Sequence, residues 1–266
     1  MAMACSIILL AVSGLSLYGM LSQEWADDAL QEQLKNIFED GAEGGGTEPG
    51  KDSHAENAGM GSADEGNPDG GTDMFHPGLA ALHKENPDCI GWIRIEGTMI
   101  DYPVMHRPSE ESYYLHRDFY GEYSANGSLF LSEACDPETS DNLVIYGHHM
   151  KSGKMFAALE KYKEPAFYEG HLEISFYTLY GKETYQIFSV FCTSVGTGDG
   201  FPYYAFIKAG DMDEYREFVR NVKGLSLYDT GITADYGDKL LTLSTCEYSR
   251  KNGRFVAVAK KIRQQG

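Results

Sequence analysis

The chain has 266 residues, of which 42% are hydrophobic, and this is enough to bury an ordinary globular core. Its 22 Lys and Arg against 40 Asp and Glu leave a formal net charge of −18. That balance argues against a nucleic-acid partner, because binding phosphate backbones requires clustered basic side chains.

The cysteines form neither a C-x-x-C pair nor a zinc spacing with histidine, so the sequence predicts no metal and no cofactor. Cys89, Cys135 and Cys192 lie in apolar surroundings, which is typical of small buried side chains. Cys5 lies in an apolar N-terminal segment, and Cys246 is the one whose surroundings suggest chemistry.

Residues 1–22 contain no charge and have the length of about 20 residues that a bilayer core requires. A signal peptide would show basic residues first and a small-x-small cleavage site, and neither is evident. The sequence therefore predicts an uncleaved transmembrane anchor. No Lys or Arg precedes it to set its orientation, but the acidic segment that follows suits the outer side.

Residues 23–40 have apolar side chains on one helical face, at Leu30, Leu34, Ile37 and Phe38, which predicts an amphipathic stem helix. Residues 41–73 hold ten of the 30 glycines and almost no large apolar side chain, so they cannot offset their ordering entropy. We expect a disordered linker with a span on the order of 30 Å. A tether that gives reach and a tolerated insertion are both compatible with this composition.

From residue 74 the pattern is mainly that of strands. Helices are expected at 75–86, 155–163 and 211–222. Strands are expected at 90–95, 99–105, 128–131, 142–146, 171–180, 183–194, 239–246 and 254–259, with a hairpin turn at 181–182. No βαβ repeat is present, so we predict a mainly β domain with peripheral helices, built as a closed antiparallel or mixed barrel.

Three of these strands end on side chains that suit acyl transfer. The strand 239–246 ends on Cys246, the strand 142–146 is followed by Gly147 and His148, and Arg254 opens the last strand. A thiolate attacks carbonyls, an imidazole can move a proton to a leaving amine, and a guanidinium can stabilise an oxyanion. The alternatives are a buried structural cysteine, a turn histidine and a surface arginine.

Thr242-Leu-Ser-Thr-Cys246, with Tyr146-Gly-His148 upstream and Gly253-Arg254-Phe-Val downstream, resembles the sortases, the cysteine transpeptidases of Gram-positive cell surfaces. The resemblance covers about residues 74–266. The stretches Asp101-Tyr-Pro-Val and Gly127-Ser-Leu-Phe-Leu, together with a helical insert before the cysteine strand, are most similar to class B. The resemblance implies a closed barrel of about eight strands, held outside the cell on a single-pass anchor in the cell membrane.

The resemblance also implies roles for individual residues. Cys246 would attack the carbonyl of a threonine in the sorting signal of a surface protein, His148 would protonate the departing amine, and Arg254 would stabilise the oxyanion. An amine of the cell wall or of a pilin would then resolve the thioester. Ser244 and Glu247 would help to bind the substrate, although a strand-packing serine and a solvated carboxylate are the alternatives.

His149 competes with His148 for the catalytic role. Neighbouring residues on a strand point in opposite directions, and the family motif places the imidazole directly after the glycine, which favours His148. The loop 196–209 carries Phe201, Tyr203, Tyr204 and Phe206. These rings would either line a peptide groove or form core beneath the following helix.

Two other functions fit the same residues. Water in place of the amine would make a cysteine peptidase, and structural roles for the three residues would leave a non-catalytic anchored binding module. A thiol-redox function is disfavoured, because Cys246 has no resolving cysteine near it in the sequence.

Overall fold

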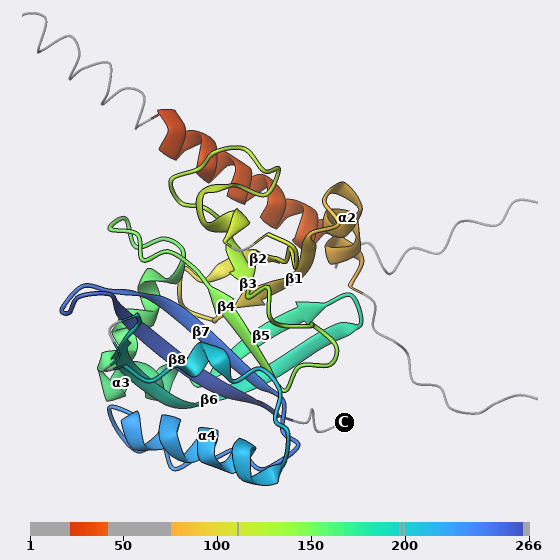
Figure 1. Ribbon diagram of the computed structural model, residues 1–266. Helices are drawn as coiled ribbons and strands as arrows, with labels where there is room; N and C mark the ends of the chain where they lie inside the picture. Colours follow the sequence, from red (N-terminus) through yellow and green to blue (C-terminus); the bar gives the residue numbers. More distant parts are fainter. Residues whose placement is uncertain (1–21, 42–75, 111, 197, 199, 263–266) are drawn as a thin grey trace, which may run out of the picture.

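A computed structural model describes residues 22–41, 76–110, 112–196, 198 and 200–262. Within these residues, eight strands close into a barrel in the order β1-β2-β3-β4-β7-β8-β6-β5, which confirms the mainly β barrel (Figure 1). Its pairs are antiparallel except β2–β3 and β4–β7, so the barrel is mixed. None of the described helices is long and apolar enough to cross a bilayer. The predicted anchor lies outside the described residues apart from Ser22, and so does the predicted linker after Gly41.

The strands begin and end close to where alternation and turn residues place them. Their bounds are β1 Cys89–Arg94, β2 Asp101–Met105, β3 Leu129–Leu131, β4 Asn142–Tyr146, β5 Glu173–Thr178, β6 Gly181–Ser194, β7 Leu240–Glu247 and β8 Gly253–Ile262. The expected hairpin turn at 181–182 is wrong by two positions. The turn is Leu179–Tyr180, and Gly181 already pairs with Thr178 at a φ of 132°, a backbone conformation that favours glycine.

Helices cover the barrel at both ends. The predicted helix at 75–86 is α2, Pro77–Glu85, and the short helix α3 spans Pro165–Gly170. The 3₁₀ helices are η2 Tyr113–His116, η3 Phe156–Lys163 and η4 Tyr203–Ala205. The segment 155–163, expected as a helix without further distinction, is therefore the tighter 3₁₀ form.

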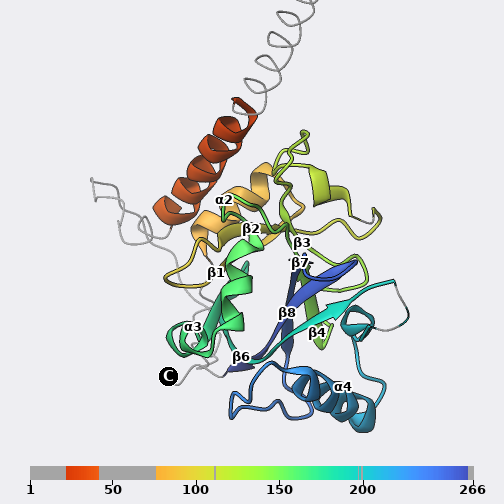
Figure 2. The same ribbon diagram turned by 90° about the vertical axis from the view of Figure 1, so that its left-hand side faces the viewer.

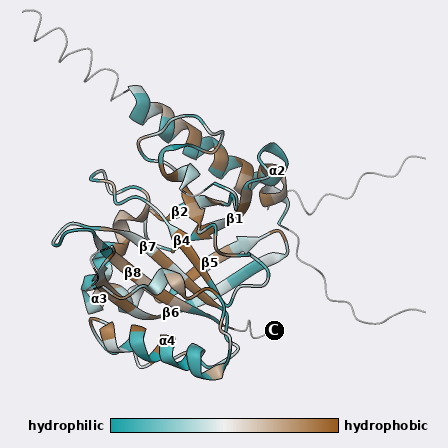
Figure 3. Ribbon diagram, viewed as in Figure 1, coloured by the Kyte–Doolittle hydropathy of each residue, from teal (hydrophilic) through white to brown (hydrophobic). Residues whose placement is uncertain are grey.

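The helix α4, Met212–Leu225, buries the four side chains that its periodicity predicts, Tyr215, Phe218, Val219 and Val222. The Asp211 carboxylate caps it by accepting hydrogen bonds from the amides of Asp213 and Glu214 at 3.0 and 2.9 Å. Figure 3 shows apolar residues along β6, β7 and β8 and polar residues on the outward face of α4.

The predicted stem is also a helix, over residues 22–41, and it packs against the barrel. Leu34 and Phe38 join a core cluster that includes Leu79 of α2 and Trp92 of β1. Figure 2 shows this N-terminal helix beside α2, at the end of the barrel opposite α4. The barrel interior forms a second, larger cluster.

Candidate active site

The barrel topology brings the three predicted strand ends to one edge. β4 and β7 are parallel, with Tyr146 opposite Ser244, so both strands end on the same side. β7 and β8 are antiparallel, and Cys246 lies directly opposite Arg254. Directly opposed residues point to the same face of a sheet, so the thiol and the guanidinium share a face.

His148 follows β4 through Gly147, which is tied to the cysteine strand. The Gly147 amide donates to the Ser244 carbonyl at 3.2 Å, and the Thr245 hydroxyl donates to the Gly147 carbonyl at 2.8 Å. A Cβ at position 147 would overlap the Leu129 side chain and lie 2.8 Å from the Phe156 ring. Glycine leaves room for both side chains where the chain passes them and brings the histidine beside the end of β7.

His148, Cys246 and Arg254 all line one open cleft of about 440 Å³. Ser244 and Tyr204 also contribute to its wall. Cys246 is half-buried, whereas Cys89 and Cys135 are buried. The cleft is thus lined by a nucleophile, a proton carrier and a fixed positive charge, which are the groups that acyl transfer requires.

The His148 ring is oriented by η2. Its Nε2 lies 2.7 Å from the Leu115 carbonyl oxygen, which can only accept, so Nε2 carries a hydrogen and the lone pair of the neutral ring is on Nδ1. The His116 ring stacks on it with centroids 5.3 Å apart. Burial lowers the pKa of His148 below 6.5; the Leu115 carbonyl opposes this, and the His116 charge adds to it.

His149 does not line the cleft. Its Nδ1 lies 3.0 Å from the carbonyl oxygen of Cys246, and its Nε2 lies 3.3 Å from the Glu160 carboxylate. The expectation that only one of the two histidines points to the cleft therefore holds for His148. The strand geometry behind that expectation is wrong, because β4 ends at Tyr146 and both histidines lie beyond it.

The two predicted substrate contacts differ in their positions. Ser244 lines the cleft and is 1% exposed, and its hydroxyl is 2.6 Å from that of Tyr203. Glu247 is 3% exposed and does not line the cleft. Its carboxylate accepts from Lys163 at 3.0 Å and from Ser249 at 2.7 Å. The alternative of a solvated carboxylate is wrong, and the structure does not bring Glu247 to the substrate space.

The other described cysteines are not suited to attack. Cys89 and Cys135 are buried, and burial raises their pKa to about 12 and about 11, which keeps both thiols protonated at neutral pH. Burial also raises the pKa of Cys192. No group of acidic, cysteine and histidine side chains within the described part of the chain could hold a metal ion.

Sequence reasoning did not anticipate Leu115, His116 or the tie between Thr245 and Gly147. These contacts join residues tens of positions apart, and no local pattern marks them. The aromatic loop gave a partial signal. Tyr203 and Phe206 are core, whereas Tyr204 lines the cleft, so both expected roles occur within one loop.

Comparison with known proteins agrees with this geometry. The model of the sortase domain family matches residues 93–262, well over half of the chain. Sortase B of Staphylococcus aureus is 36% identical over 190 residues, which cover 70% of this chain and 75% of that protein. Sortase B of Listeria monocytogenes is 32% identical over 187 residues, covering 69% and 74%.

Among solved structures, the Staphylococcus aureus sortase B–substrate complex superimposes with a TM-score of 0.74 at 28% identity. The match covers 92% of this chain and 100% of that one. The domain match, the two relatives and the shared barrel agree with one another. The chain therefore belongs to the sortase family, within class B, whose members are cysteine transpeptidases that act on peptide sorting signals.

Proposed function

We propose that this class B sortase is membrane-anchored, that it cleaves a threonine-containing sorting signal through a thioester on Cys246, and that it passes the acyl group to an amine of the cell wall or of a pilin. The observation that carries the proposal is the single cleft lined by His148, Cys246 and Arg254. The uncharged segment 1–22 supports an anchor, with the catalytic domain on the outer side of the membrane.

In the first step the Cys246 thiol gives its proton to the neutral His148 ring, and the sulfur forms a bond to the threonine carbonyl carbon. The carbon–nitrogen bond then breaks, and His148 gives its proton to the departing amine. In the second step an incoming amine attacks the thioester and His148 takes up the amine proton. The carbon–sulfur bond then breaks, and His148 returns that proton to the sulfur, which regenerates the Cys246 thiol. Arg254, directly opposite Cys246, donates to the oxyanion that forms in both steps.

The test is turnover of a peptide that carries a threonine-containing sorting motif, followed by product analysis with and without an added amine. We expect Cys246→Ala and His148→Ala to abolish turnover and Arg254→Ala to lower kcat by about 10²- to 10³-fold. Cys192→Ala is the matched control and should retain activity, because Cys192 does not line the cleft.

The products separate the alternatives. A peptide–amine conjugate supports transpeptidation, whereas free acid alone in the presence of amine indicates a peptidase. Undiminished function of the Cys246→Ala protein would contradict the proposal and favour a binding module.

A further inference from the structure

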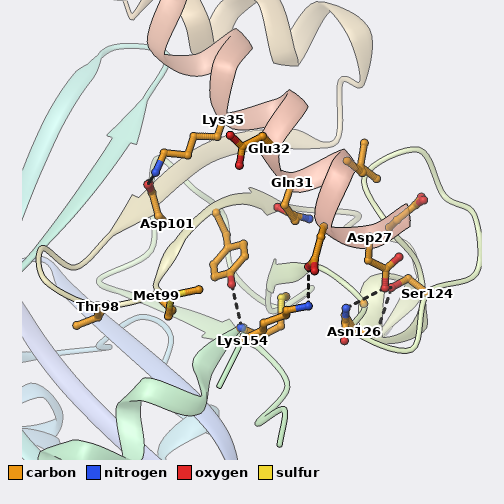
Figure 4. A pocket seen from close by; sticks show the side chains of 16 residues that line it. Asp27, Gln31, Glu32, Lys35, Thr98, Met99, Asp101, Ser124, Asn126 and Lys154 are labelled. Carbon is orange, nitrogen blue, oxygen red and sulfur yellow. Dashed lines mark hydrogen bonds and ion pairs between the residues drawn. The ribbon is translucent and has the colours of Figure 1, made fainter. Parts of the chain in front are cut away.

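The N-terminal helix contacts the barrel in two different ways. Towards its C-terminal end, Leu34 and Phe38 pack into the core and are 0% and 2% exposed. Towards its N-terminal end, the helix passes over a hollow of about 440 Å³ whose opposite wall comes from Thr98 to Tyr102, the loop at 124–127 and Lys154 (Figure 4). Around this hollow the side chains of the helix form ion pairs and hydrogen bonds with the barrel domain.

The first of these contacts reaches the segment that continues from His148. Asp28 and Glu24 of the helix pair with the Lys154 ammonium at 2.5 and 3.4 Å. Lys154 lies two residues before Phe156, whose amide donates to the His148 carbonyl at 2.9 Å. The segment from Lys154 to Phe156 is also tied to β2, since the Met155 amide donates to the Tyr102 hydroxyl at 3.1 Å.

The second contact reaches the segment that contacts the His148 ring itself. The Asp27 carboxylate accepts from the Ser124 hydroxyl and from the Asn126 amide, each at 2.8 Å (Figure 4). The Ser124 amide in turn donates to the His116 carbonyl at 3.1 Å. His116 stacks on His148, and the neighbouring Leu115 carbonyl bonds its Nε2.

We propose that the N-terminal helix positions His148 for proton transfer. Asp27 and Asp28 would be the positioning residues, because Asp28 holds the segment bonded to the His148 backbone and Asp27 holds the segment that contacts its ring. The inference rests on the role proposed above for His148. Residues 22–31 of the helix are exposed or half-buried. The polar contacts of Asp27 and Asp28 can therefore be removed one at a time while the buried Leu34 and Phe38 keep the helix attached.

The experiment compares the full chain with Lys154→Met, Asp28→Asn, their double variant and Asp27→Ala. A small displacement of a proton carrier is costly to the rate, so we expect each to lower kcat by about tenfold with KM nearly unchanged. The double variant should be no worse than Lys154→Met, because that change already removes the pair between Lys154 and Asp28. The imidazole resonances of His148 should move in every variant that loses activity.

Two controls keep the outcome clear. Asp28→Glu retains the charge and should restore most of the activity. Lys35 lies further along the same helix and pairs with Asp101 of β2 at 2.8 Å. Lys35→Gln breaks this pair, which involves neither Lys154 nor Ser124, and should leave kcat and the His148 resonances unchanged.

Unchanged kcat and unchanged His148 resonances in Lys154→Met and Asp27→Ala would overturn the proposal. So would a loss of activity that is accompanied by faster amide exchange across residues 22–41, since the cause would then be detachment of the helix. A fully active His148→Ala protein would instead contradict the proposed function, so the two failures are distinguishable.

Discussion

His148 lines the cleft, and two neighbouring residues fix the position of its ring. The half-buried ring contacts the Leu115 carbonyl on one edge and the His116 ring on one face. Burial disfavours the imidazolium and lowers the pKa of His148, and electrostatic repulsion from His116 adds to that effect. The neutral form, with its lone pair on Nδ1, is therefore the resting state at neutral pH.

The effect of His116 can be measured directly. In the Cys246→Ala protein, NMR titration of His148 should give a pKa below 6.5 because burial lowers it. His116→Phe keeps an aromatic ring in contact but removes the second charge, so the pKa of His148 should rise towards its usual value. A pKa that is unchanged or lower in His116→Phe would show that His116 has no electrostatic influence.

Ser244 illustrates how one hydroxyl can belong to both core and cleft. Tyr203→Phe removes the 2.6 Å hydrogen bond and leaves the buried Ser244 hydroxyl without it, so the free energy of unfolding should fall by about 1–2 kcal/mol. Ser244→Ala should cost a similar amount, and the double variant less than the sum. Urea denaturation measures all three.

Kinetics then decide whether Ser244 touches the substrate. If it does, Ser244→Ala should raise KM. Tyr203→Phe keeps the serine and should leave KM unchanged. Equal KM values in the two variants would restrict Ser244 to packing.

The strand β7 separates the cleft from a charged cluster of Glu247, Lys163 and Glu160. Cys246 points into the cleft, and the next residue, Glu247, points to η3, where it pairs with Lys163. The alternation of side chains along a strand accounts for the separation. Burial alone would raise the pKa of Glu247, but Ser249 and Lys163 outweigh this and hold it below 4.5.

Lys163→Met should therefore weaken the fold in a pH-dependent way. Removing one partner of a buried pair is destabilising, and because Lys163 is partly exposed we expect about 2 kcal/mol at neutral pH. The pKa of Glu247 is lowered by folding, so this contribution is present above its usual pKa and is lost as the pH falls through the folded value.

Urea denaturation at neutral pH and near pH 3 checks this prediction, with Lys161→Met as the exposed control on the same 3₁₀ helix. A difference between Lys163→Met and the parent protein that is equal at both pH values would contradict it. KM should stay unchanged, because Glu247 lies outside the cleft.

Across the whole molecule, the N-terminal helix is a docked part of the catalytic domain. Phe38 stacks between His76 and Trp92, with ring centroids 4.2 and 4.5 Å away. Phe38→Ala should reduce the free energy that holds the helix on the barrel by about 3–5 kcal/mol. Amide exchange should accelerate over residues 22–41 while the barrel strands keep their protection. Equal loss of protection in helix and barrel would show that they unfold as one unit.

Short-range sequence patterns predict most of the strands and helices of this fold. The apolar run at 142–146 predicted the strand β4, and helical periodicity predicted the buried face of α4. The Thr-Leu-Ser-Thr-Cys246 motif with its upstream histidine predicted the family. These features depend on side chains within a few positions of one another, where backbone geometry dictates which of them share a face. The roles of the individual site residues stay predictions until the variants are measured.

The features that sequence reasoning missed arise from pairings between distant segments. The parallel contact of β4 with β7, the Leu115 carbonyl under His148, the burial of Glu247 by Lys163 and the docking of the N-terminal helix join residues 33 to about 100 positions apart. Their energy comes from packing and hydrogen bonds that exist only once the barrel closes, so no window of local sequence contains them. Local patterns thus supplied the strands and the reactive groups, and closure of the barrel placed those groups around one cleft.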